Sequence, residues 1–60
     1  MDNWEIVDSK GTIHSGPETE MRFAMKVMMN PDDFSKKAKE KYYVSWKGDL
    51  RLIQIHQIHR

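Results

Sequence analysis

The alternation of hydrophobic and polar residues predicts a β-hairpin at the start of the chain. Trp4 and Ile6 alternate with polar residues, and the extended pattern resumes at Ile13 after an Asp-Ser-Lys-Gly break. Aspartate favours the first position of a type I turn, and glycine readily adopts the left-handed conformation that closes a bulged hairpin. We therefore expect strands near residues 3–8 and 11–15.

The next segment has the periodicity of an amphipathic helix. Ser15 and Glu18 match a capping box, and Pro17 fits the first helical turn, where its missing N–H group is not needed. These signals predict a helix near residues 17–29. Its hydrophobic stripe follows i, i+3, i+4, i+7 spacing at Met21, Ala24, Met25 and Met28 and is widened by Phe23 and Val27.

A break and a second helix start follow at Asn30-Pro31-Asp32-Asp33. Proline ends the first helix, and Asn30 can cap a new turn that has two acidic residues in its first positions. Phe34 and Ala38 are spaced to share one face, while the intervening lysines face solvent. The pattern predicts a short helix near residues 32–39.

The C-terminal part has the pattern of a second hairpin. Tyr42, Val44 and Trp46 alternate with polar or amphipathic residues, a Lys-Gly-Asp turn follows, and a second strand is expected through Leu52 to Ile58. The phase of the hydrophobic residues changes within that second strand. Either a bulge near Leu52 or a strand covered on both faces by a second subunit would explain the change.

These elements predict an α+β fold in a single domain spanning residues 1–60. Two β-hairpins form a small antiparallel sheet, and one principal helix packs across it in the order ββαββ, with a short second helix as an option. A chain of 60 residues buries only about 60% of the surface that its unfolded form exposes, so a partner subunit would add stability. We therefore expect a homodimer.

Composition and charge narrow the function classes. The chain has no cysteine, which excludes disulfides and thiolate metal sites and fits a reducing cytoplasm. Its net charge is +1, but residues 1–33 hold seven acidic and three basic side chains, whereas residues 34–60 hold two acidic and seven basic ones. No signal peptide and no membrane span is visible, so a cytoplasmic location is expected.

Catalytic and metal-binding patterns are weak. The serines lie at turn, cap or strand positions outside a nucleophile elbow, and the isolated glycines form no phosphate-binding loop. His56 and His59 make an H-x-x-H pair, but residues three apart on a strand point to opposite faces. We expect neither an enzyme nor a bound metal or other cofactor.

Two motifs carry a resemblance to a known class of protein. W-x-I-x-D-x-x-G-x-I, from Trp4 to Ile13, and W-x-G-D-L-x-L, from Trp46 to Leu52, resemble small accessory proteins of tailed phages and prophages that share a hairpin–helix–hairpin layout. The resemblance is architectural, since the motifs contain turn residues and no active-site residues. It implies a protein that binds a bacterial host protein and inhibits or redirects it, as an anti-defence factor would.

Two surfaces are candidates for binding. Tryptophan, tyrosine and arginine dominate binding hot spots, which points to Tyr43, Trp46, Lys47 and Arg51. Met29 and Phe34 lie where the apolar arc of the helices exceeds what a small sheet can cover. We therefore expect a non-enzymatic, protein-binding accessory factor.

The alternative is a small module that binds single-stranded nucleic acid through residues 36–51. Four lysines, Lys47 and Arg51 are interleaved there with Tyr42, Tyr43 and Trp46, a mixture that suits phosphate contact and base stacking. A sequence pI of about 8.1 is lower than a dedicated nucleic-acid binder usually has. Binding to phosphates would weaken steeply with salt, which distinguishes the two readings.

Overall fold

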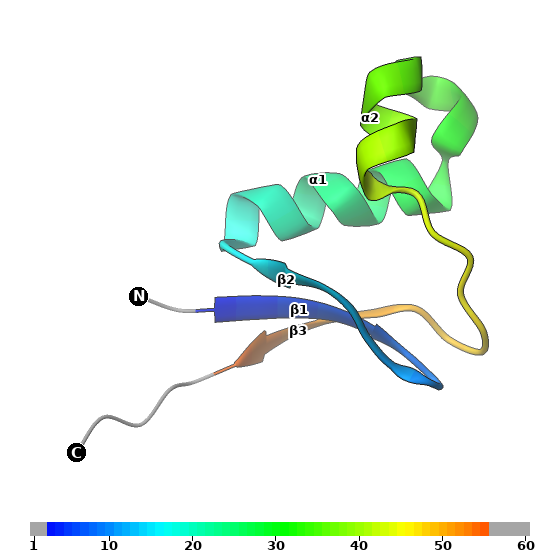
Figure 1. Ribbon diagram of the computed structural model, residues 1–60. Helices are drawn as coiled ribbons and strands as arrows, with labels where there is room; N and C mark the ends of the chain where they lie inside the picture. Colours follow the sequence, from blue (N-terminus) through cyan, green and yellow to red (C-terminus); the bar gives the residue numbers. More distant parts are fainter. Residues whose placement is uncertain (1–2, 56–60) are drawn as a thin grey trace.

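The computed structural model describes residues 3–55, which form a three-stranded antiparallel sheet with both helices on one side (Figure 1). The α+β class is therefore as expected. The elements in chain order are β1 (Asn3–Asp8), β2 (Gly11–Gly16), α1 (Glu18–Met29), the 3₁₀ turn η1 (Pro31–Asp33), α2 (Lys36–Tyr42) and β3 (Arg51–Ile55).

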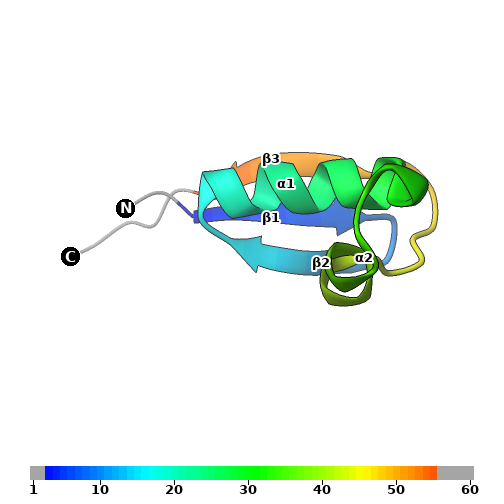
Figure 2. The same ribbon diagram turned by 90° about the horizontal axis from the view of Figure 1, so that it is seen from above.

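The strands lie in the order β2-β1-β3, so the first strand of the chain is the central one. Seen from above, α1 lies over the sheet while α2 lies near β2 (Figure 2). The register of β1 with β2 shifts between Ile6 and Val7, which marks a bulge or irregularity there. The register of β1 with β3 is regular from Arg51 to Ile55, so a bulge near Leu52, one of the two explanations for the phase change, is wrong.

The N-terminal hairpin is confirmed, and the side chain of Asp8 explains its turn. One carboxylate oxygen of Asp8 accepts hydrogen bonds from the backbone N–H groups of Lys10 at 2.8 Å and Gly11 at 3.2 Å. Gly11 has a φ of +130°, which an L-residue rarely adopts. The Asp-Ser-Lys-Gly sequence therefore sets the turn locally.

The principal helix is confirmed as α1, but its start differs from the capping box. Pro17 is the N-cap residue and no side chain caps the helix, because Ser15 still belongs to β2. The fully buried residues are Ile6 of β1 and Met21, Ala24, Val27 and Met28 of α1. Met25, expected at the centre of the stripe, is only half-buried, since Val27 turns inward and Phe23 remains 41% exposed.

The short second helix begins later than expected. Asn30 precedes the 3₁₀ turn without a side-chain cap, whereas the hydroxyl of Ser35 accepts a hydrogen bond from the backbone N–H of Ala38 at 3.2 Å. That cap starts α2 at Lys36 and carries it to Tyr42. Tyr42 is therefore the last helical residue and not the first residue of a strand.

The ββαββ order is wrong, because residues 43–50 form no strand. The helix ends with a hydrogen bond from Tyr43 N–H to Lys39 C=O, and the chain then crosses the molecule as an extended connection to β3. The turn predicted at Lys47-Gly48-Asp49 is present as a bend, with Gly48 at φ +74°. Ile58, His56 and His59 lie outside the described residues.

Candidate protein-binding surface

The predicted site residues Tyr43, Trp46 and Lys47 all lie on the connection, and Arg51 begins the strand that follows it. We call these four residues the basic–aromatic strip. The rings of Tyr43 and Trp46 meet edge to face, with centroids 6.2 Å apart. Trp46 packs against the core cluster, whereas Tyr43 remains 41% exposed.

Two residues of the hairpin turn hold the connection to the sheet. The carbonyl of Lys47 accepts hydrogen bonds from the Ser9 backbone N–H at 3.0 Å and the Ser9 hydroxyl at 2.7 Å. The second carboxylate oxygen of Asp8 accepts a hydrogen bond from the Lys47 backbone N–H at 2.9 Å. These hydrogen bonds involve only backbone atoms of Lys47, and the residue is exposed to solvent.

The charge of Asp8 is part of this contact. The backbone N–H of Lys47, and after it that of Lys10, stabilises the carboxylate and holds the pKa of Asp8 below its ordinary value of 3.8. Hydrogen bonds to the charged form of an acid have this effect because protonation removes an acceptor. The connection is thus fastened most firmly when Asp8 is ionised.

Gly48 fits closely beside the same turn. A Cβ atom at position 48 would lie 2.9 Å from both the Cβ and the hydroxyl of Ser9. Any larger residue would push the connection away from the hairpin turn. The sequence signal for a glycine turn was correct, but its contact with Ser9 could not be predicted because the two residues are far apart in the chain.

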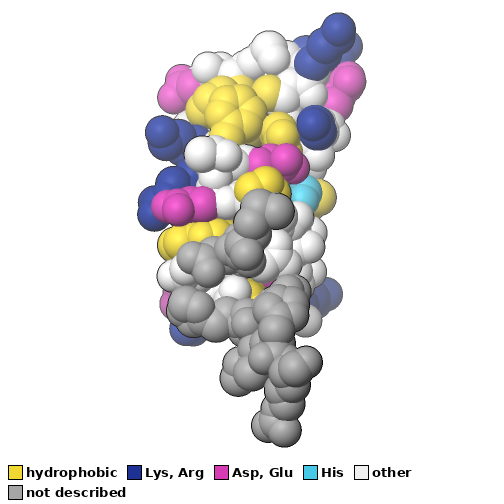
Figure 3. Space-filling model, turned by 90° about the vertical axis from the view of Figure 1, so that its left-hand side faces the viewer, with side chains coloured by type: hydrophobic (Ala, Val, Ile, Leu, Met, Phe, Trp, Pro, Cys, Tyr) yellow, Lys and Arg dark blue, Asp and Glu magenta, His cyan; other side chains and the backbone are white. Residues whose placement is uncertain are grey.

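Phe34 belongs to a different cluster. Phe23 of α1 packs edge to face against both Phe34 and Tyr42. Its ring centroid lies 5.4 Å from that of Phe34 and 5.5 Å from that of Tyr42. Tyr42 in turn meets His14 of β2, whose Nε2 lies 2.7 Å from the Tyr42 carbonyl. Figure 3 shows a patch of hydrophobic atoms in the upper, helical part of the molecule, with charged side chains around it. Sequence reasoning missed this aromatic row.

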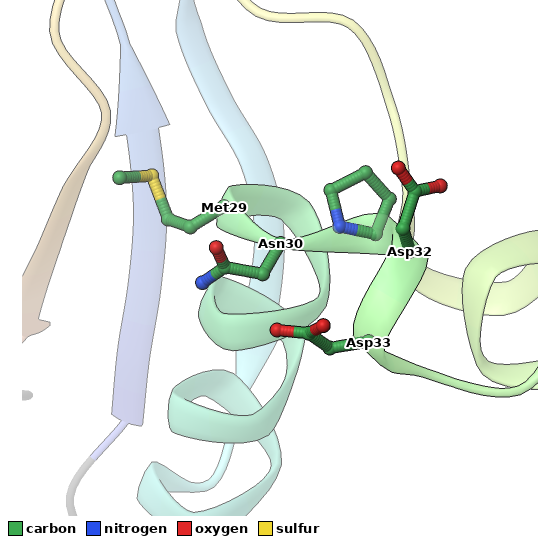
Figure 4. Close-up of a pocket in the computed structure, with 5 residues that line it drawn as sticks. Met29, Asn30, Asp32 and Asp33 are labelled. Atoms are coloured by element: carbon green, nitrogen blue, oxygen red, sulfur yellow. The ribbon is translucent and has the colours of Figure 1, made fainter.

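Met29 is 55% exposed at the end of α1 and lines a shallow hollow of about 300 Å³ with Asn30, Pro31, Asp32 and Asp33. Figure 4 shows the carboxylates of Asp32 and Asp33 turned away from each other. Within residues 3–55, no group of three or more histidine, cysteine, aspartate or glutamate side chains could hold a metal ion. Met29 lies at the end of α1, whereas the basic–aromatic strip lies on the connection and at the start of β3.

Comparison with protein-family models gives no match, and comparisons with curated proteins and with solved structures find no significant similarity. No helix in the described part of the chain is long and apolar enough to cross a membrane. We therefore infer function from the residues of the chain and their arrangement.

Proposed function

We propose that this chain is a non-enzymatic accessory factor that binds another protein through the basic–aromatic strip and the adjoining edge of β3. The resemblance to phage and prophage accessory proteins suggests the kind of partner and the cell in which the chain acts. The partner is then a bacterial host or defence protein, and the chain is a phage-encoded inhibitor that acts in the host cytoplasm.

The observation that carries the proposal is the difference between the two edges of the sheet. β2 is irregular, ends in Gly16-Pro17 and is linked through His14 to α2. β3 pairs with β1 on one side only among the described strands, has a regular register, and contains neither proline nor lysine. Proteins commonly protect exposed strand edges with bulges, prolines or lysines, so the β3 edge is suited to accept an added strand.

The connection supplies exposed side chains on the path from α2, near β2, to the start of β3. Tyr43 and Val44 are 41% and 37% exposed, and they lie in extended backbone on the path to Arg51. Exposed tyrosine and arginine form strong contacts in protein interfaces. An extended partner segment could therefore contact both the strand edge and these side chains.

Local charge indicates the chemistry of the partner segment. Lys10, Lys47 and Arg51 are exposed near the hairpin turn, and Asp49 is the nearest exposed acid along the connection. The carboxylate of Asp8 is already occupied by backbone N–H groups. The resulting surface favours an extended segment that carries acidic side chains.

The nucleic-acid alternative has less support. Of the three aromatic residues that could stack on bases, Tyr42 packs against Phe23 and Trp46 packs against the core, which leaves Tyr43 exposed. Single-strand binders use several exposed aromatic rings along a basic groove. The exposed lysines of α2 alone supply charge but no stacking surface.

A photo-crosslinking experiment tests the proposal directly. A benzophenone-bearing phenylalanine analogue replaces Tyr43, and in a control variant it replaces Thr19, which is exposed near the start of α1. In bacterial cells we expect one dominant protein adduct from position 43 and none from position 19. Equal adducts from both positions, or none from position 43, would contradict the proposal.

Affinity for the captured protein then tests the side chains. Tyr43→Ala with Lys47→Ala should weaken binding by at least about tenfold, or roughly 1.4 kcal/mol, while Thr19→Ala with Lys26→Ala should leave it unchanged. Arg51 is kept intact, so that the comparison depends on the side chains of Tyr43 and Lys47 alone. Binding of a single-stranded oligonucleotide that weakens steeply with salt would instead support the alternative.

We also propose that the chain functions as a homodimer, as its size suggests.

A further inference from the structure

The sheet has one face without helices in the described structure. Both helices lie on the same side of the sheet (Figure 1), and Ile6 points toward α1 in the core. Side chains alternate along a strand, so Glu5 and Val7 point to the opposite side. We call this side the open face.

Four residues form the centre of the open face. Glu5 pairs with Ile53 across β1 and β3, and Val7 pairs with Arg51. Glu5 and Arg51 therefore occupy one diagonal of a four-residue block, and Val7 and Ile53 occupy the other. Diagonal neighbours in an antiparallel pair lie roughly 7–8 Å apart.

The two charges are not used in ion pairs within the described chain. The ion pairs among residues 3–55 join Arg22 to Glu18 and Lys39 to Asp32. Glu5 accepts a hydrogen bond from the Thr12 hydroxyl at 3.1 Å, and Arg51 is exposed. The face thus presents one carboxylate and one guanidinium together with two β-branched apolar side chains.

We infer that a second copy of this chain covers the open face, with Glu5 of each copy opposite Arg51 of the other. A two-fold interface brings residue i of one copy against residue j of its partner, and residue j against residue i. A two-fold axis that exchanges Glu5 and Arg51 also places Val7 and Ile53 close to their own counterparts. The block is therefore complementary to itself in both charge and polarity.

Self-complementarity is what selects a second copy over an unrelated protein. A single two-fold axis produces two Glu5–Arg51 ion pairs between the copies. It also brings Val7 and Ile53 of both copies together, which excludes water from these side chains. Like charges that met across the face would repel, so the arrangement also fixes the relative orientation of the two copies. The strands of the two sheets would cross, as they do in orthogonal packings of sheets.

Charge reversal tests this inference without requiring a known partner protein. The unmodified chain should have roughly twice its 7.2 kDa mass in light scattering at micromolar concentration. Glu5→Arg and Arg51→Glu should each be monomeric, because each places like charges across the interface. An equimolar mixture of the two should again give the dimer mass, since every cross pair is then of opposite sign.

The mixture separates contacts between copies from contacts within one chain. Pairing of Glu5 with Arg51 inside a single chain would give no reason for the two variants to associate. Glu20→Arg makes the same charge change on an exposed residue of α1 and should remain dimeric. A monomeric unmodified chain, a dimeric Glu5→Arg variant or a mixture that stays monomeric would overturn the inference.

A cysteine scan covers the case in which a charge variant fails to fold. The chain has no cysteine, so Ile53→Cys and Thr19→Cys each introduce a single thiol. Because Ile53 lies close to its counterpart, Ile53→Cys should form a disulfide-linked dimer at least tenfold faster under mild oxidation than Thr19→Cys. Equal rates for the two variants would overturn the inference.

Discussion

We call residues 35–50, which comprise α2 and the connection, the outer segment. It contains no fully buried residue. The body of the molecule, formed by the three strands and α1, contains all the fully buried hydrophobic side chains of the described chain. Tyr42, Trp46 and Leu50 attach the outer segment by half-buried contacts. Asp8 and Ser9 attach it by hydrogen bonds to Lys47.

This difference separates stability from the proposed binding function. The body depends on apolar burial, whereas the outer segment is attached at a few points and exposes Tyr43 and Val44 between them. Substitutions in the body should therefore unfold the protein. Substitutions on the exposed part of the outer segment should change binding and leave the fold intact.

The largest effect is expected in the body. Met28→Ala removes a fully buried side chain and should cost about 2–5 kcal/mol. A domain of this length has about 3–9 kcal/mol of stability in total, so much of the protein should be unfolded. Urea unfolding followed by circular dichroism measures the loss.

The neighbouring residue provides a matched control. Met29→Ala makes the same chemical change at a side chain that is 55% exposed, and its cost should be less than 1 kcal/mol in magnitude, roughly the range of surface substitutions. Equal losses for the two variants would mean that α1 does not pack on the sheet through the face that contains Met28.

A smaller effect is expected where the outer segment meets the hairpin turn. Gly48→Ala adds a Cβ that would lie 2.9 Å from the Cβ of Ser9. Overpacking of this kind typically costs about 1–3 kcal/mol. In a Ser9→Gly background the clashing atoms are absent, so the same substitution should cost less.

The difference between the two backgrounds measures the contact itself. A double-mutant cycle removes the cost of placing alanine at positive φ, because both backgrounds share it. Urea midpoints of the four proteins provide the measurement. An identical cost in both backgrounds would show that Gly48 is required for its backbone conformation alone.

Local sequence signals predicted the body well. The hairpin turn follows from Asp8 and Gly11, and α1 follows from the spacing of its methionines, since both depend on residues close in the chain. The orientation of Val27 was not predicted, because a wide apolar arc does not reveal which flank meets the sheet.

The outer segment was predicted poorly for a physical reason. Tyr42 to Trp46 alternate like a strand, but Tyr42 completes α2, and Ser9 and Asp8 hold the backbone of Lys47 at the hairpin turn. The Ser35 cap extends α2 through Tyr42. The predicted site residues therefore lie in two places. Phe34 packs against Phe23, whereas the basic–aromatic strip lies on the connection and at the start of β3.

The smallest effect is expected from the protonation of Asp8. Its pKa is lower in the folded protein than its ordinary value of 3.8, because backbone N–H groups of Lys47 and Lys10 bind the charged form. The stabilisation is therefore fully present above the ordinary pKa and is lost as the pH falls through the lower, folded value. Acidification below about pH 4 should loosen the contact of Lys47 with the hairpin turn before it affects the core.

Asp8→Asn isolates this contribution. Asparagine has one acceptor oxygen and no charge. It therefore cannot accept hydrogen bonds from the N–H groups of Lys10, Gly11 and Lys47 together, as the carboxylate does. Between pH 7 and pH 3, the unmodified chain should lose more stability than the variant, and amide exchange at Lys47 should accelerate most. If the two proteins show the same pH dependence, Asp8 does not hold the outer segment to the body, and its attachment must come from the packing of Tyr42, Trp46 and Leu50.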